Sequence, residues 1–371
     1  MNWEIITFLG YFVILLGVAL IFYFNGSNKN SEDFFLGGRS MGPWVTALSA
    51  QASDMSAWLL MGLPGAIFVS GLTESWIAIG LFIGTYLNWK ILAARLRKMS
   101  YAAGDAITIP EYFQKRFFTQ NPVIRFACAA IIFVFFLIYT ASAFSSGAKL
   151  FNYMFGTDYT LSLTIGALII ISYTFLGGFF AVCWTDLIQG LLMFAALVVV
   201  PLVCIIQTPD VSAVQFLNAD GAVISNYLNL FENVNGDIAW TTILSGLAWG
   251  LGYFGMPHIL VRFMSIEKPS MVKKSATVAI IWVICALGCA CLIAYFGRMF
   301  LAEELLTAGA QKMVFIDFAR KLFPSFIAGI LMAAIIAASM STADSQLLVA
   351  SSSFTSDIYK PIIRKDADEK E

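Results

Sequence analysis

Asp54 is the acidic residue whose surroundings point most strongly to a function, because it lies inside an apolar stretch. Residues 50–62 read AQASDMSAWLLMG, and apolar residues continue on both sides, from about 44 to 71. A carboxylate in a membrane-spanning helix costs about 2.5 to 3.5 kcal/mol on insertion scales, so such a residue typically has a functional partner. Asp54 and the neighbouring Ser56 therefore indicate an ion or ligand site within a membrane.

A second polar cluster lies in the segment IIAASMSTADSQLLVASSS (335–353). Ala338, Ser341 and Thr342 are spaced i, i+3 and i+4, so they share one face of a helix. Neutral hydroxyl and carbonyl oxygens suit a monovalent hard ion such as Na⁺, whereas sites for Mg²⁺ or Ca²⁺ normally include carboxylates. The alternative is structural, because Ser and Thr in membrane helices often bond to their own backbone. Spacing alone leaves both interpretations open.

The composition indicates a membrane protein. Of 371 residues, 59% are hydrophobic and only 12% are charged, which exceeds what a soluble chain of this length can bury. The net charge of −1 and the absence of a basic tract indicate no nucleic-acid partner. No nucleophile–base arrangement or phosphate loop is present, so we expect a non-enzyme in a lipid bilayer, without cofactor or obligatory protein partner.

The apolar runs predict about nine transmembrane helices, since about 20 apolar residues cross a bilayer. The first run, 4–24, lacks a basic n-region and is expected to be a retained helix. The predicted spans are 4–24, 43–71, 74–96, 122–150, 160–180, 184–207, 239–260, 275–300 and 325–356, followed by a polar tail at 357–371.

Basic residues set the expected orientation, because Lys and Arg are retained in cytoplasmic loops. With the N-terminus outside and the C-terminus inside, seventeen of the 22 basic residues, Lys29 and Lys370 among them, lie inside. The five outside are Lys149, Arg298, Lys312, Arg320 and Lys321. The loop at 208–239 carries acids, among them Asp210 and Asp220, but no base. An odd number of spans, such as nine, fits this orientation.

Two of the predicted spans carry helix-breaking residues. The second span contains Gly62, Pro64 and Gly65, and the seventh reads SGLAWGLGYFGMPHIL at 245–260. Pro removes a backbone donor and Gly weakens a helix, so both spans are expected to unwind locally. Free backbone groups at membrane depth are tolerated where they line a cavity, as in transporters built from inverted repeats. A separation of five spans agrees with a repeat of five helices.

Several long motifs carry a family resemblance. They are FFLGGRSMGPW (34–44), ASDMSAWLLMGLPGA (52–66), ITIPEYFQKRF (107–117), YTFLGGFFAVCWTDLIQG (173–190), WGLGYFGMPHIL (249–260) and MSTADSQLL (340–348). In these motifs the chain resembles the solute:sodium symporter family, and within it the branch that transports proline. The resemblance implies an all-α, leucine-transporter-type fold: an extra helix at 4–24, a first repeat at 43–207, and a partial second repeat at 239–356 that makes the chain look truncated. It also implies a multi-pass protein of the cell (inner or plasma) membrane.

The resemblance also implies roles for individual residues. A Na⁺ site would use the carbonyls of Ala52 and Met55 together with Ala338, Ser341 and Thr342. L-proline would contact Tyr139, Trp249, Tyr253 and Pro257. Roles in ion affinity or coupling would fall to Asp54, Ser56 and Arg39, and an accessory cation site would use Asp186, Asp344 and Ser345. The implied function is sodium-coupled uptake of L-proline by alternating access.

Departures from the family pattern keep two alternatives open. Ala57 stands where some relatives have Gly, and Met256 stands where some proline carriers have Gln. Met256 removes a polar contact, so another small solute is one alternative. A symporter-like membrane sensor module is the other. The single histidine, His258, is expected to make a structural hydrogen bond, with proton coupling as the alternative.

Overall fold

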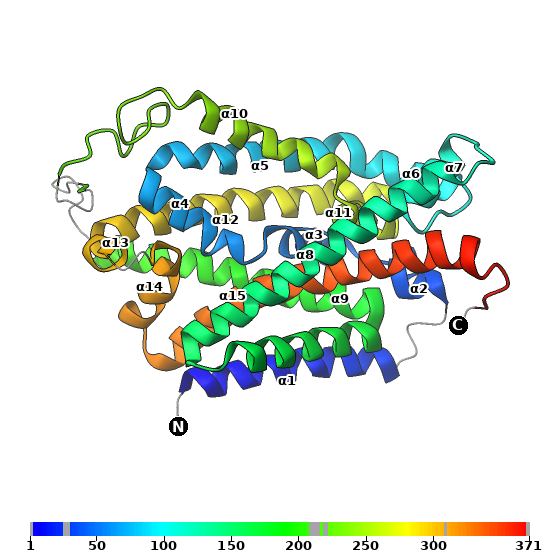
Figure 1. The fold of residues 1–371 in the computed structure, drawn as a ribbon, viewed down its shortest axis with the longest axis horizontal. Coiled ribbons are helices and arrows are strands. Elements are labelled where there is room, and N and C mark those ends of the chain that lie inside the picture. Colours follow the sequence, from blue (N-terminus) through cyan, green and yellow to red (C-terminus); the bar gives the residue numbers. More distant parts are fainter. Residues whose placement is uncertain (1–2, 25–29, 208–215, 218–221, 308–309, 369–371) are drawn as a thin grey trace.

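The computed structural model describes residues 3–24, 30–207, 216–217, 222–307 and 310–368. Within these ranges the regular secondary structure is helical, with three isolated β-bridges and no strand. The long helices lie roughly parallel in an elongated bundle, with the N-terminus at one end and the C-terminus at the other (Figure 1). The all-α expectation is therefore confirmed.

Five long helices form most of the bundle: α1 (Trp3–Phe24), α8 (Val123–Phe155), α9 (Tyr159–Gln207), α12 (Val272–Phe300) and α15 (Ser325–Phe354). Helix α15 is the most buried of them and packs against α1, α3, α8 and α9. Its small residues allow this close approach, as is typical of helix packing in membranes.

The remaining elements are shorter. The α-helices are α2 (Ser31–Leu36), α3 (Pro43–Met55), α4 (Gly62–Ser70), α5 (Trp76–Leu87), α6 (Ala94–Ala102), α7 (Ile109–Arg116), α10 (Trp240–Trp249), α11 (Pro257–Ser265), α13 (Ala302–Thr307) and α14 (Val314–Leu322). The 3-10 and π-helical segments are η1 (Gly37–Arg39), η2 (Ala57–Leu59), η3 (Leu72–Ser75), η4 (Asn88–Ala93), η5 (Gly250–Gly255), η6 (Pro269–Met271), η7 (Gln311–Met313) and η8 (Thr355–Ile363).

By length and hydropathy, six helical segments of the described chain can cross a membrane, and the bent pair α3–α4 adds a seventh. Two features separate this number from the nine predicted spans. Helix α9 has 49 residues, but its backbone turns at Gly178, where φ is 54° and ψ is −152°. The two parts run back along each other on either side of this turn (Figure 1), which matches the predicted spans 160–180 and 184–207. The predicted span 239–260 is divided into α10, η5 and α11, each too short to count alone.

Both expected helix breaks are present. Helix α3 ends at Met55, Ser56 takes φ 50° and ψ −175°, and the axis bends by 71° before α4. Along the seventh segment, α10 tightens into the 3-10 helix η5, and Met256 is extended before Pro257 begins α11. The side chain of Asn88 donates to the Tyr253 carbonyl, at 2.9 Å, which satisfies a backbone acceptor freed by the break.

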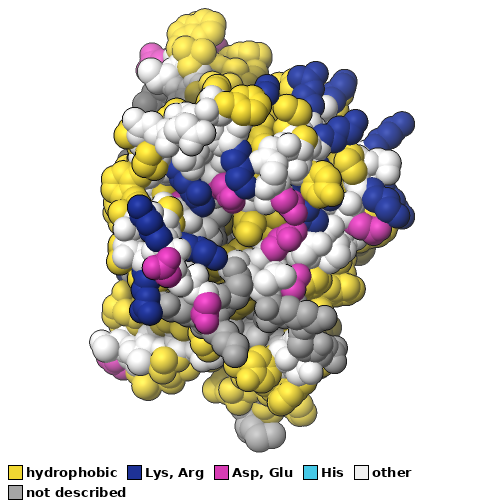
Figure 2. All heavy atoms as spheres, turned by 90° about the vertical axis from the view of Figure 1, so that its right-hand side faces the viewer, with side chains coloured by type: hydrophobic (Ala, Val, Ile, Leu, Met, Phe, Trp, Pro, Cys, Tyr) yellow, Lys and Arg dark blue, Asp and Glu magenta, His cyan; other side chains and the backbone are white. Residues whose placement is uncertain are grey.

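Basic side chains gather at the end of the bundle that holds α6, α7 and the C-terminus (Figure 2). This is the end that the sequence predicts to face the cytoplasm. The N-terminus, α13 and α14 lie at the opposite end (Figure 1). Lys29, Lys370, Asp210 and Asp220, which also enter the orientation argument, lie outside the described residues.

Candidate functional site

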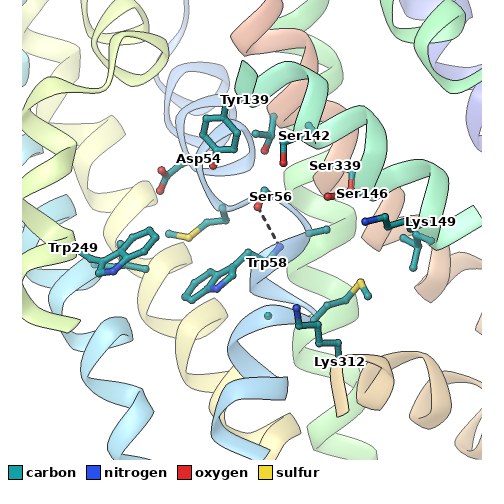
Figure 3. Close-up of a pocket in the computed structure, with 18 of the residues that line it drawn as sticks. Asp54, Ser56, Trp58, Tyr139, Ser142, Ser146, Lys149, Trp249, Lys312 and Ser339 are labelled. Carbon is teal, nitrogen blue, oxygen red and sulfur yellow. Dashed lines mark hydrogen bonds between the residues drawn. The ribbon is translucent and has the colours of Figure 1, made fainter. Parts of the chain in front are cut away.

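A cavity of about 520 Å³ lies beside the break between α3 and α4. Its walls come from the broken segments α3–η2–α4 and α10–η5, from one face of α8, and from η7 and α15 (Figure 3). The lining side chains include Asp54, Ser56, Trp58, Tyr139, Ser142, Ser146, Lys149, Trp249, Tyr253, Met256, Lys312 and Thr342. The unwound backbone thus lines a cavity, where free peptide groups are tolerated.

The predicted cation ligands meet next to this cavity. The Ser341 hydroxyl contacts the Ala52 carbonyl, at 2.8 Å, and the Ala338 carbonyl, at 3.2 Å. The Thr342 hydroxyl donates to the same Ala338 carbonyl at 3.1 Å. Met55, the last residue of α3, lines the cavity, and so does Thr342. We call Ala52, Met55, Ala338, Ser341 and Thr342 the neutral oxygen cluster. Its oxygens come from two helices that are 289 residues apart at Ala52 and Ser341.

Asp54 points into the cavity and has a specific partner. The Tyr253 hydroxyl donates to Asp54 Oδ2 at 2.5 Å, linking the broken helix α3 to the 3-10 segment η5. The partner of the Asp54 carboxylate is therefore a phenol from a distant part of the chain. The reason is geometric: η5 places Tyr253 opposite the end of α3, so a side-chain donor reaches the carboxylate.

Two tryptophans form an apolar wall of the cavity. The rings of Trp58 and Trp249 are stacked, with centroids 6.4 Å apart and planes within 9°. Trp58 follows Ser56, whose hydroxyl accepts a hydrogen bond from the Trp58 backbone N–H at 3.2 Å. The role of Trp58 was missed from the sequence, although an aromatic residue four positions after Asp54 in a broken helix was an available signal.

The four predicted solute contacts divide into two groups. Tyr139, Trp249 and Tyr253 line the cavity, and Tyr139 lies close to Asp54 (Figure 3). Pro257 does not belong to the lining. It is buried and begins α11, so its effect on the cavity is through the direction of the backbone at the break.

The predicted accessory cation residues surround an arginine. Within the bundle, the Arg262 guanidinium donates to Asp186 Oδ2 at 2.8 Å, to Ser345 Oγ at 2.6 Å and to Ser49 Oγ at 2.6 Å. The Ser49 hydroxyl donates in turn to Asp186 at 2.6 Å. We call Ser49, Asp186, Arg262, Asp344 and Ser345 the arginine cluster. Each of its side chains is buried.

Asp344 completes the arginine cluster. It accepts hydrogen bonds from Ser345 Oγ, at 3.1 Å, and from the Tyr173 hydroxyl. The positively charged side chain of Arg262 thus lies between Asp186 and Ser345, two of the residues that the sequence predicts to bind a second cation. By sequence, Arg262 is one of the seventeen basic residues assigned to the inner side, because it lies two residues beyond the predicted span 239–260.

The ring of His258 makes a contact different from the expected one. Neither ring nitrogen has a hydrogen-bond partner in the described part of the chain, and the ring packs on Phe136 with centroids 5.6 Å apart. The backbone carbonyl of His258 is the polar contact, since it accepts from Arg262 at 2.5 Å. The expected structural hydrogen bond of the His258 side chain is therefore wrong for the described residues, because the buried ring packs against an aromatic neighbour instead.

Arg39 lies at the end of the bundle that holds α6 and α7, where it contacts Ser100 and Ala106. Its guanidinium lies 2.6 Å from Asp105 and donates to the carbonyls of Met264, at 2.9 Å, and Ala106, at 2.8 Å. A β-bridge between Met41 and Ile266 holds the same end. Burial raises the pKa of Glu32, which lies 3.7 Å from Arg39, and the nearby Asp105 adds to the shift. Arg39 thus fastens α11 to the loops at this end.

Comparisons with known proteins agree with this geometry. The model of the sodium:solute symporter family matches residues 34–371. The sodium/proline symporter of Escherichia coli (strain K12) is 44% identical over 364 residues, which cover 97% of this chain and 71% of that protein. The osmoregulated proline transporter of Bacillus subtilis (strain 168) is 43% identical over 372 residues, covering 100% of this chain and 74% of that protein.

A solved structure gives the same fold. It is described as the substrate-bound outward-open state of a Na⁺-coupled sialic acid symporter, with a TM-score of 0.80 and 20% identity. The alignment covers 100% of this chain and 77% of that one, so the leucine-transporter-type fold expected from the sequence is confirmed. These relatives are multi-pass membrane transporters rather than enzymes, and the chain belongs to the sodium:solute symporter family.

Proposed function

We propose that this protein takes up L-proline by sodium-coupled alternating access. The observation that carries the proposal is the neutral oxygen cluster, which lies between α3 and α15 at the inner wall of a cavity with an aromatic side. Relatives at 43–44% identity are named as proline transporters. Stacked Trp58 and Trp249 offer a flat apolar surface to a small ring such as that of proline.

The coupling follows from the position of the cluster. A Na⁺ ion held by Ala52, Ser341 and Thr342 would replace a direct hydrogen bond between α3 and α15 with ion–oxygen contacts to both helices. The same end of α3 carries Asp54, which is bonded to Tyr253 in the solute cavity. Sodium and solute therefore act on one broken helix, and each raises the affinity for the other. The membrane potential adds about 2.3 kcal/mol per charge per 100 mV to the inward step.

Two lining residues bear on the alternative that this protein transports a solute other than proline. Ala57 and Met256 both line the cavity and offer no polar side-chain group. Proline needs few such contacts, whereas a polar solute would need more. A competition panel of small amino acids and compatible solutes therefore belongs in the same assay.

The test is uptake of labelled L-proline into proteoliposomes that contain the 371-residue chain. We expect uptake above that of empty liposomes with an inward Na⁺ gradient, and only background with an equal K⁺ gradient. Equal uptake in the two gradients would contradict sodium coupling. Stronger uptake of a different solute, with proline at background, would contradict the proline assignment.

A further inference from the structure

We propose that Lys149 and Lys312 form an outer carboxylate-binding subsite, which captures the solute before it reaches the aromatic wall. This inference rests on the proposed function, and it assigns a binding role to two residues outside the sodium and aromatic positions. Both lysines line the cavity, on the side away from Asp54 and Trp249 (Figure 3).

These lysines differ from the other bases at the same end of the bundle. Arg320 lies 3.3 Å from Glu4, Lys321 lies 2.5 Å from Glu304, and Arg298 is buried and donates to a backbone carbonyl. In contrast, no described carboxylate lies within ion-pairing distance of Lys149 or Lys312. Arg298 also lacks an ion pair among the described residues, but it is buried and its guanidinium is bonded to the Leu217 carbonyl. Lys149 and Lys312 have no such partner in this part of the chain, and both line the cavity.

Helix α8 carries a polar track from this subsite into the cavity. Tyr139, Ser142, Ser146 and Lys149 are spaced i, i+3, i+7 and i+10, and all four line the cavity. At 1.5 Å per residue, Lys149 lies about 15 Å along the helix from Tyr139. A carboxylate at Lys149 is therefore at a separate site, and the two serine hydroxyls offer hydrogen bonds between this site and Tyr139.

The second lysine is brought to the cavity by close packing. Lys312 lies on η7, and a Cβ atom at Gly65 of α4 would lie only 3.2 Å from the Lys312 Cα. The glycine therefore lets η7 rest directly on the broken helix. A larger residue at position 65 would move Lys312 away from the cavity.

Charge is distributed unequally along the cavity. Among the described residues that line the cavity, Asp54 is the one carboxylate, and it lies away from the two lysines (Figure 3). A zwitterionic amino acid is therefore attracted with its carboxylate toward Lys149 and Lys312 and its ammonium toward Asp54. Clefts with one sign of charge raise the local concentration of an oppositely charged group. The lysines repel Na⁺, so their benefit is specific to the solute.

The first test is the kinetics of labelled proline uptake by Lys149→Gln with Lys312→Gln. We expect the KM for proline to rise about tenfold, by loss of electrostatic capture, with an unchanged maximal rate and a sodium half-saturation that is unchanged or lower. Lys149→Arg with Lys312→Arg retains the charge and should keep a KM near that of the unmodified protein. An unchanged KM in the Gln pair, or equal losses in the Gln and Arg pairs, would overturn the subsite.

A second test does not need proline to be the solute. Ser146→Cys places a thiol on the polar track, and its labelling by anionic and cationic methanethiosulfonates is compared, with the protein lacking this cysteine as background. We expect the anionic reagent to react faster, and the preference to be lost when both lysines are Gln. An equal preference with and without the lysines would overturn the subsite. Absence of proline uptake with the labelling preference intact would instead contradict the proposed function.

Discussion

Two sets of contacts, one helical turn apart, join helices α3 and α15, and we call them the neutral level and the fixed level. The neutral level consists of uncharged oxygens, and the fixed level contains a charged side chain. At the neutral oxygen cluster, Ala52 of α3 meets Ser341 of α15 through a hydroxyl and a carbonyl. At the arginine cluster, Ser49 of α3 and Ser345 of α15 both contact the guanidinium of Arg262. The neutral oxygen cluster offers oxygens to a cation. The arginine cluster already contains a cation, the guanidinium of Arg262.

The difference separates an exchangeable cation from a fixed one. Arg262 is held by the carboxylate of Asp186 at 2.8 Å, and strong charge pairing in a buried place opposes release. Hydroxyls and carbonyls attract Na⁺ more weakly, so an ion held by them can leave when the cavity opens to the other side. A transporter needs such release on every cycle, and the neutral level therefore suits the transported ion.

The largest expected effect comes from breaking the fixed level. Arg262→Ala leaves Asp186 buried without its charged partner, which typically costs about 3 to 5 kcal/mol. We expect a large fall in the yield and thermal stability of purified protein, measured by its unfolding in detergent. Arg262→Gln combined with Asp186→Asn removes both charges and should recover part of this loss. Wild-type stability in Arg262→Ala would show that the arginine cluster does not hold the two helices.

A smaller but more specific effect comes from breaking the neutral level. Ser341→Ala with Thr342→Ala removes two oxygens at about 1 kcal/mol each, which corresponds to an increase of about 30-fold in the sodium concentration for half-maximal uptake. Ser351→Ala is the matched control, because this hydroxyl lies on the same helix and donates to the Leu347 carbonyl. A sodium dependence that is the same in the double variant and the control would remove the ion from this cluster.

The smallest of the three effects is expected at Asp54, which lies beside the neutral level. Asp54→Asn keeps an acceptor for the Tyr253 hydroxyl but removes the negative charge. We expect normal insertion and about a fivefold loss of sodium affinity, equivalent to about 1 kcal/mol of Coulomb energy at close range. Tyr253→Phe keeps the charge and should change sodium affinity less. Failed insertion of Asp54→Asn, with unchanged sodium affinity in the protein that remains, would assign a structural role to this carboxylate.

The sequence was a good guide wherever one helix decides the outcome. Apolar length predicted most of the long helices, and Gly and Pro predicted both breaks. The spacing of Ser341 and Thr342 predicted that both hydroxyls lie on one face of α15, where both contact the Ala338 carbonyl, and the use of these oxygens for an ion stays a prediction. Contacts between helices were harder, because they depend on packing that no local pattern encodes. The Tyr253 partner of Asp54 comes from 199 residues away. The sequence places Arg262 in an inner loop, whereas α11 holds its side chain in contact with α3, α9 and α15.

The glycines between α5 and the broken segment α10–η5 restrict which sequences this protein can tolerate. A Cβ atom at Gly80 would lie 2.2 Å from the Gly246 carbonyl oxygen, and one at Gly84 would lie 2.3 Å from that of Gly250. The two backbones are in direct contact, so even alanine at these positions would push the helices apart. Trp249, at the end of α10, and Tyr253, in η5, would move with this segment, although neither had been changed. If the solute binds at the aromatic wall of the cavity, as we propose, substitutions on α5 that never touch the solute would alter solute preference.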